Sequence, residues 1–129
     1  LEGALKLKEV SYIHAEGYPS GELKHGPLAL IDSQMATTVI MPKDSMFVKN
    51  LNIVKEIKSK GGKVISITSN QTEAGSNKDD DTIYIPDTSE LISPVLTCIP
   101  LQLFSYFTAI KLGRNVDKPR NLSKSVTVE

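Results

Sequence analysis

Residues 37–68 constrain the fold most, because they have the pattern of a β-strand, an amphipathic helix and a second β-strand. Residues 37–41 and residues 63–68 are rich in β-branched side chains, which favour strands. Between them, Asp44 or Ser45 can cap a helix. The apolar face of that helix is formed by Phe47, Leu51, Val54 and Ile57, and Gly61-Gly62 ends it. Two strands joined through one such helix pair in parallel by a right-handed crossover.

The rest of the chain continues this alternation. We expect a largely buried helix over residues 1–16, a loop over 17–27, an exposed loop over 70–81, a strand over 82–85, an apolar helix over 93–111 and an irregular tail over 114–129. Pro100 is expected to kink or split the long helix, and Gly113 to end it. This order predicts an α/β fold of three layers, with helices on both faces of a mainly parallel sheet. Because no strand precedes the first helix, the sequence predicts an N-terminally truncated domain.

Composition excludes several functional classes. The 129 residues are 40% hydrophobic and 23% charged, which predicts one compact core. Fifteen basic and fifteen acidic residues give a formal net charge of +0, so no overall field attracts nucleic acid or an anionic membrane. Cys98 has no disulfide partner, and no apolar run approaches the roughly 20 residues that span a bilayer. We therefore expect a cytoplasmic location, with no nucleic acid and no membrane as partners.

Three groups of residues are candidates for chemistry. Glu2, Lys6 and Glu9 have the i, i+4, i+7 spacing that puts three side chains on one stripe of a helix. His25 lies in a loop rich in Gly and Pro, and an imidazole can transfer protons near neutral pH. Lys124 could form a Schiff base with a carbonyl if a dry pocket lowered its proton affinity. Each group also has a structural interpretation: an ion-pair ladder, a loop histidine and a solvated lysine.

Other motifs indicate no site. Residues 79–81 are three consecutive aspartates, but they lack the ligand spacing and the glycine of a calcium loop. Cys98 lies among apolar neighbours, as a small core residue does. The sequence has no zinc-type Cys and His spacing, no Walker phosphate loop and no dinucleotide fingerprint. It therefore predicts neither a metal nor a cofactor.

Two separated stretches match a known family. The first is LKLKEVSYIHAE at residues 5–16, followed by GELKHGP at residues 21–27. The second is DKPRNLSKSVTVE at residues 117–129. Together, and in this order, they resemble the isomerase part of the glutamine:fructose-6-phosphate amidotransferase family, also called the glucosamine-6-phosphate synthases. The resemblance covers essentially the whole chain, and the tail ends where the family ends.

The resemblance implies a sugar isomerase (SIS) domain, in an enzyme that converts fructose 6-phosphate and glutamine-derived ammonia to glucosamine 6-phosphate. Lys124 matches the family's Schiff-base lysine, and His25 matches its ring-opening histidine. Glu9 matches the carboxylate that moves a proton between carbons 1 and 2 of the sugar. Glu2 and Lys6 match charged residues of the same pocket. Aldose–ketose isomerisation needs a carboxylate base with a cation beside it. The resemblance therefore implies a catalytic role for the predicted stripe of Glu2, Lys6 and Glu9.

The resemblance also implies how the chain is organised. Residues 1–113 correspond to the second of two SIS domains, without its first strand, and residues 114–129 to a catalytic tail. His25 is expected to complete the site of a neighbouring subunit in a homodimer. The family's sugar-phosphate loop and its glutamine-cleaving domain lie outside these 129 residues, so the chain alone is expected to be inactive. Ser123 and Gly17 depart from the alanine common in relatives, but both are small.

Two other functions stay open. The same fold serves in regulators that bind phosphosugars without turnover, so a non-catalytic sugar-phosphate-sensing domain is one alternative. An interaction domain that oligomerises through the apolar helix at 93–112 is another. The tail around Lys124 favours the enzyme, because a sensor has no use for an imine-forming lysine.

Overall fold

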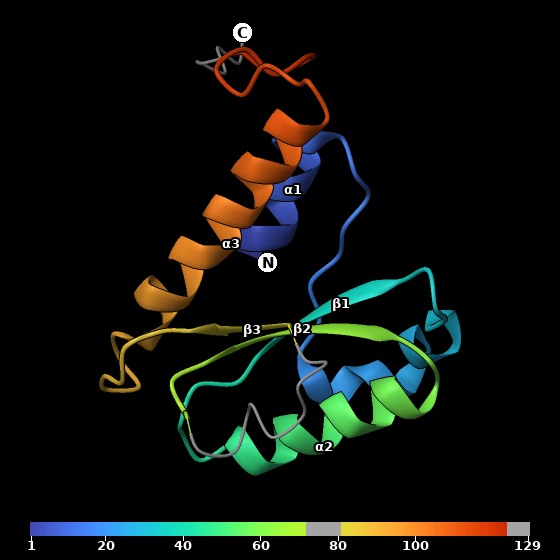
Figure 1. The fold of residues 1–129 in the computed structure, drawn as a ribbon, viewed down its shortest axis with the longest axis vertical. Coiled ribbons are helices and arrows are strands. Elements are labelled where there is room, and N and C mark those ends of the chain that lie inside the picture. The colour runs from blue at the N-terminus through green and yellow to red at the C-terminus, as the bar shows by residue number, and fades with distance from the viewer. Residues whose placement is uncertain (72–80, 124–129) are drawn as a thin grey trace, which may run out of the picture. The chain divides into compact units, whose positions relative to one another are not determined.

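The computed structural model describes residues 1–71 and 81–123 (Figure 1). The elements, with η for a 3₁₀ helix, are α1 (Glu2–Ser11), η1 (Ser20–His25), η2 (Pro27–Leu30), β1 (Ala36–Ile40), α2 (Phe47–Ser59), β2 (Lys63–Thr68), β3 (Asp81–Tyr84) and α3 (Ser93–Lys111). The chain forms two compact units, one of Leu1–Gly17 with Leu101–Glu129 and one of Tyr18–Pro100. Each unit has its own packing.

The unit Tyr18–Pro100 is built on a parallel sheet. Within the described residues the sheet has three strands in the order β1-β2-β3. Thr37 lies opposite Val64 in the first pair of strands, and Ile67 lies opposite Ile83 in the second. Each predicted strand is found within one residue of its expected bounds. The predicted α/β class with a parallel sheet is therefore confirmed.

Helix α2 covers one face of this sheet (Figure 1) and supplies much of the core. The core cluster is Leu23, Val39, Met41, Phe47, Val54, Ile57 and Val64. The predicted apolar face of α2 is confirmed, although Leu51 is only half-buried. The expected cap is not formed: Asp44 Oδ1 accepts the N–H of Met46 at 2.8 Å in a turn ahead of the helix, and no side chain caps the first turn of α2.

The two glycines that end α2 serve different purposes. Gly61 has φ +83°, a conformation that other residues rarely adopt. The N–H groups of Gly61 and Gly62 bond to the carbonyls of Lys58 and Ile57, which makes a Schellman end. A Cβ on Gly62 would lie 2.5 Å from Cγ2 of Ile31, so close packing excludes a side chain there.

The connecting segments agree only in part with expectation. Residues 17–27, predicted as a loop, contain η1 and the start of η2, because short 3₁₀ turns tolerate a proline just before the first residue, as Pro19 is for η1, or at it, as Pro27 is for η2. In the predicted loop over 70–81, Asp81 already belongs to β3, and residues 72–80 lie outside the described residues.

Helix α1 is shorter and more exposed than its sequence predicts. It ends at Ser11, because Tyr12 adopts φ 63° and turns the chain out of the helix. Gly3 and Ser11 are its buried residues, whereas Leu5 is 44% exposed. The expectation of a largely buried helix is therefore wrong for this unit: within α1 only Gly3, which lies against Leu101 of α3, and Ser11 are buried, and the other residues are half-buried or exposed.

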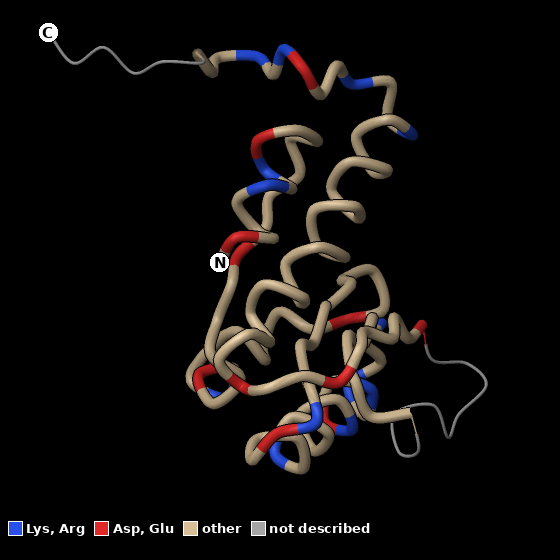
Figure 2. Tube along the Cα trace, turned by 90° about the vertical axis from the view of Figure 1, so that its left-hand side faces the viewer, with Lys and Arg blue, Asp and Glu red and all other residues tan. Residues whose placement is uncertain are grey.

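Helix α3 is continuous. Pro100 lies inside it and removes one backbone donor, but does not split it. Figure 2 shows α3 as a stretch without charge, since its first charged residue is Lys111. By length and composition α3 could cross a membrane, with a mean hydropathy of 1.3, which is weak evidence for a span. The sequence predicts no apolar run near the length of a membrane span, and α3, with 19 residues, is an exception by average hydropathy. Polar residues such as Gln102 interrupt its apolar run without greatly lowering the mean hydropathy of the helix.

Candidate active site

The predicted stripe of charge is formed on α1. The ammonium of Lys6 donates a hydrogen bond to Glu9 Oε2 at 2.7 Å and lies 4.0 Å from Glu2 Oε1. All three side chains are partly exposed. The hydrogen bond to Glu9 raises the pKa of Lys6, although partial burial opposes the shift. Lys6 therefore stays protonated near neutral pH and keeps a cation beside the Glu9 carboxylate.

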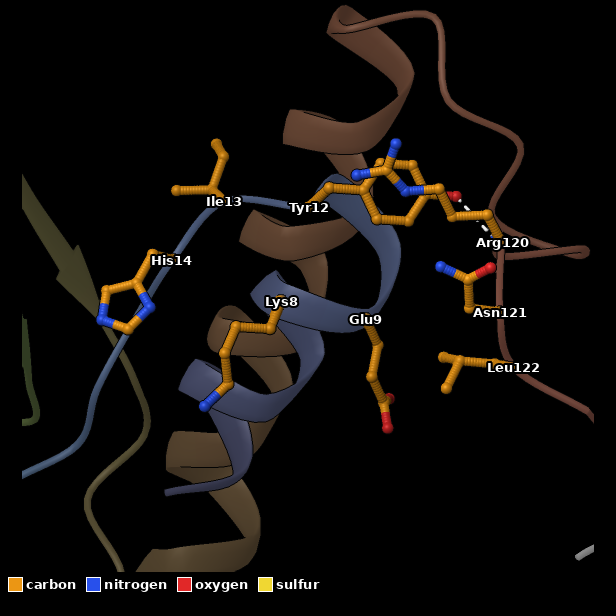
Figure 3. A pocket seen from close by; sticks show the side chains of 8 residues that line it. All are labelled: Lys8, Glu9, Tyr12, Ile13, His14, Arg120, Asn121 and Leu122. Atoms are coloured by element: carbon orange, nitrogen blue, oxygen red, sulfur yellow. Dashed lines mark hydrogen bonds between the residues drawn. The ribbon is translucent and has the colours of Figure 1, made fainter.

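Glu9 also lines an open pocket of about 440 Å³ in the unit Leu1–Gly17 with Leu101–Glu129. One wall is α1 and the chain after it, and the other is the segment after α3. The lining residues are Lys8, Glu9, Tyr12, Ile13, His14, Arg120, Asn121 and Leu122. In Figure 3 the Glu9 side chain lies on the side of α1 next to Asn121 and Leu122, whereas the Lys8 side chain lies on the opposite side of the helix. A carboxylate thus lines a pocket of mixed polar and apolar character, with a wall contributed by the C-terminal segment.

The C-terminal segment, residues 112–123, reaches this pocket through a series of turns. Gly113, with φ 66°, ends α3 as predicted, and the N–H of Arg114 bonds to the carbonyl of Ala109. Asn115 Oδ1 then accepts the N–H groups of Asp117 and Lys118, at 2.9 and 3.1 Å. This Asx-type turn redirects the chain toward α1.

Tyr12 is where the C-terminal segment contacts the end of α1. Its hydroxyl accepts the backbone N–H of Arg120 at 2.9 Å (Figure 3). The guanidinium carbon of Arg120 lies 4.2 Å from the ring centroid, and that of Arg114 lies 5.3 Å away. Both distances are within the range of cation–π interactions.

The remaining predicted residues are placed differently. His25 is exposed at the end of η1, in the unit Tyr18–Pro100, and its neighbour Lys24 pairs with Glu56 of α2 at 3.0 Å. Glu2, Lys6 and Glu9 belong to the other unit. Lys124 lies outside the described residues. The structure thus brings together three of the five predicted residues, and the roles of His25 and Lys124 stay predictions.

Several pocket residues were not singled out from the sequence. Tyr12 and His14 follow α1 directly, and Arg120 with Asn121 precedes Lys124. Their only signal was membership of the two stretches that carry the family resemblance. The second depression, at the carboxyl ends of the strands, holds only about 10 Å³, roughly room for one water.

A parallel α/β sheet is what the predicted sugar isomerase domain requires, and the comparison with known families identifies this class of domain. Residues 1–112 match the family described as SIS domain, and the chain belongs to this family. Over all 129 residues it is 57% identical to the isomerizing glutamine–fructose-6-phosphate aminotransferase of Aquifex aeolicus. The chain spans 22% of that relative's length. The resemblance predicted from the sequence is confirmed.

Solved structures show the same fold. The C-terminal domain of glucosamine-fructose-6-phosphate aminotransferase from Francisella tularensis superposes with a TM-score of 0.83 at 44% identity, over 90% of this chain and 33% of that one. Glucosamine-6-phosphate deaminase from Thermotoga maritima gives a TM-score of 0.76 at 29% identity, over 99% of this chain and 36% of that one. The predicted SIS-type fold is therefore confirmed.

Proposed function

We propose that this chain is the isomerase part of a glutamine–fructose-6-phosphate aminotransferase, which forms glucosamine 6-phosphate from fructose 6-phosphate and glutamine-derived ammonia. The observation that carries the proposal is the Glu9 carboxylate, held by Lys6, in a pocket whose other wall is the segment that leads to Lys124. The 57% identity to a relative of that name supports it. Because the chain spans 22% of that relative, glutamine cleavage and the sugar-phosphate loop are assigned to other parts of a longer protein.

Lys124 is proposed to form the covalent intermediate. Its amine adds to the C2 carbonyl of open-chain fructose 6-phosphate and water leaves, which gives an imine; ammonia then displaces the lysine. One residue, Ser123, separates Leu122, in the pocket wall, from Lys124, and the two steps of chain from Leu122 to Lys124 span at most about 7 Å. A lysine so close in sequence to the wall can reach a sugar bound beside Glu9.

Glu9 is proposed to move the proton that converts the ketose imine to the aldose. Its carboxylate takes a proton from C1 and returns it to C2. Lys6 holds the carboxylate in place through the 2.7 Å hydrogen bond and balances its charge, with Glu2 as a second neighbour of the ammonium. His25 is assigned to ring opening, which needs proton transfer at the ring oxygen and at the anomeric hydroxyl.

Turnover by the full-length protein tests the proposal. Fructose 6-phosphate and glutamine should give glucosamine 6-phosphate. Borohydride added with fructose 6-phosphate should fix the sugar on the peptide that contains Lys124. Lys124→Arg should abolish labelling, whereas Lys118→Arg, a control in the same segment, should keep it. Binding of the sugar phosphate without turnover would favour the sensing domain instead, and labelling at another lysine would refute the assignment of Lys124.

The proposal includes the assembly and the location that the family resemblance implies. We propose a cytoplasmic homodimer in which His25 of one subunit completes the site of the other. Large apolar residues of α3 are exposed in the chain taken alone, among them Val95 at 64% and Phe107 at 63%. A surface of this kind supports association with a further subunit or domain.

A further inference from the structure

The backbone of Tyr12 is unusual. Its φ of 63° lies in the left-handed region, where a bulky side chain is unfavourable and where helices normally end in Gly or Asn. Among the described non-glycine residues only Asn121 shares a positive φ, and Asn tolerates this conformation. A tyrosine kept in such a conformation indicates that its side chain has a role beyond ending the helix.

The contacts of Tyr12 identify that role. Its hydroxyl and its ring engage Arg120 through the backbone N–H and the guanidinium group, and its ring also engages Arg114. The hydrogen bond between Tyr12 and Arg120 joins residues 108 positions apart in the chain. The segment that they hold is otherwise largely exposed: Val116 and Pro119 are half-buried, and the other residues from Leu112 to Ser123 are exposed. Apolar burial therefore contributes little to its placement.

The held segment is also a wall of the pocket. Arg120, bound to Tyr12, is followed directly by Asn121 and Leu122, which line the pocket with Glu9. Tyr12 itself follows Glu9 by less than one turn of α1. A contact at Tyr12 thus fixes the segment at a point next to the carboxylate.

We propose that Tyr12 is a positioning residue, whose hydroxyl and ring hold the C-terminal segment against α1 so that the residues after Arg120 stand beside Glu9. A catalytic role for this positioning rests on the proposed function, in which Lys124, four residues after Arg120, is the reactive residue. The positioning of the C-terminal segment by Tyr12 does not depend on the proposed function.

Two substitutions separate the side chain of Tyr12 from its backbone. Tyr12→Asn removes the ring and the hydroxyl but suits a left-handed helix end, so a role limited to ending α1 would be kept. Tyr12→Phe keeps the ring and removes only the acceptor of the Arg120 N–H. Tyr106→Phe, on the exposed side of α3, is the matched control for the loss of a hydroxyl.

Hydrogen exchange of the full-length protein, read on peptides from residues 114–123, measures the anchoring. We expect exchange to accelerate about fivefold in Tyr12→Phe, as for the loss of one hydrogen bond. It should accelerate about tenfold or more in Tyr12→Asn, where the cation–π contacts are lost as well. Peptides from α2 and the Tyr106→Phe control should not change. Unchanged exchange in Tyr12→Asn would overturn the proposal.

Kinetics on the same variants test the link to catalysis. The kcat for glucosamine 6-phosphate formation should fall in the order wild type, Tyr12→Phe, Tyr12→Asn, in step with the loss of protection. The KM for glutamine should stay constant. Faster exchange with an unchanged kcat would show an anchor without a catalytic role and would overturn the positioning assignment. If the wild-type protein forms no product, the proposed function fails, and exchange alone decides whether Tyr12 anchors the segment.

Discussion

The Glu9 carboxylate and the Lys6 ammonium are the two groups on which the proposed chemistry depends. As a partly exposed pair on a helix, they stabilise the fold by only about 0.2–0.5 kcal/mol. Their proposed role is in the reaction, because a hydrogen bond orients the carboxylate of Glu9, and Glu9 lines the pocket. Substitutions at these positions should therefore change activity far more than stability.

Glu9→Gln in the full-length protein should reduce sugar isomerisation by about 10²-fold or more, because an amide keeps the shape of the side chain but cannot accept the proton. The measurement is the rate of glucosamine 6-phosphate formation. Glu90→Gln removes a carboxylate from an exposed turn and should leave this rate unchanged. An unchanged rate in Glu9→Gln would mean that Glu9 belongs to an ion-pair ladder and not to the site.

The pKa of Lys6 gives a second test at this scale. Hydrogen bonding to Glu9 raises it above its ordinary value of 10.5. The stability that comes from the raised pKa of Lys6 is therefore fully present at pH values just below 10.5, and it is lost as the pH rises through the higher pKa of the folded state. Competitive acetylation of Lys6 as a function of pH should give a higher midpoint in the wild type than in Glu9→Gln. Equal midpoints would contradict the hydrogen bond.

At the scale of elements, the site depends on how closely α1 approaches α3. A Cβ placed on Gly3 would lie 2.9 Å from Cβ of Leu101, so the two helices meet without space for a side chain. Two buried hydroxyls of these helices bond within their own helix: Ser11 to the carbonyl of Leu7 at 2.6 Å and Ser105 to that of Leu101 at 2.9 Å. These buried polar groups are thereby satisfied without a partner on another element.

Gly3→Val should destabilise the protein by about 1–3 kcal/mol, because the added methyl groups force α1 away from α3. The measurement is the unfolding midpoint. Gly21→Ala is the control, since a Cβ on Gly21 would meet nothing within 4 Å, and it should have little effect. Equal stability of Gly3→Val and the wild type would mean that the helices are not in close contact.

At the scale of the whole molecule, the residues assigned to the proposed site belong to different units of the chain. Glu9 and the C-terminal segment belong to one compact unit and His25 to the other. The chain covers about a fifth of its relatives' length, so a complete reaction is expected only from the full-length protein. Two experiments address this arrangement.

Mixing two inactive full-length variants, His25→Ala and Glu9→Gln, should restore part of the activity. Each mixed dimer would contain one site in which both residues are native, if His25 serves the partner's site. Exchange of subunits is verified by differently tagged chains. Mixed dimers without activity would show that His25 does not complete the site of the neighbouring subunit.

The 129-residue chain alone should be inactive and should bind fructose 6-phosphate only weakly. A phosphate dianion needs a cluster of backbone and hydroxyl donors, and this sequence has no Gly-, Ser- and Thr-rich loop of the kind that supplies them. Calorimetry with fructose 6-phosphate, beside the full-length protein, measures the difference. Submillimolar affinity of the isolated chain would contradict this expectation.

Local periodicity in the sequence was enough to determine the strand–helix–strand unit at residues 37–68, the glycine ends of α2 and α3, and the stripe of Glu2, Lys6 and Glu9. Each depends on residues within a few positions of one another, so spacing and propensity decide it. Tertiary structure alone decided that α1 ends at Tyr12 and that its pocket has Arg120, Asn121 and Leu122 as a wall. No sequence rule places a helix end at a tyrosine. The hydrogen bond at this helix end joins Tyr12 to Arg120, 108 positions away. Such a contact stabilises the helix end only once the chain has folded.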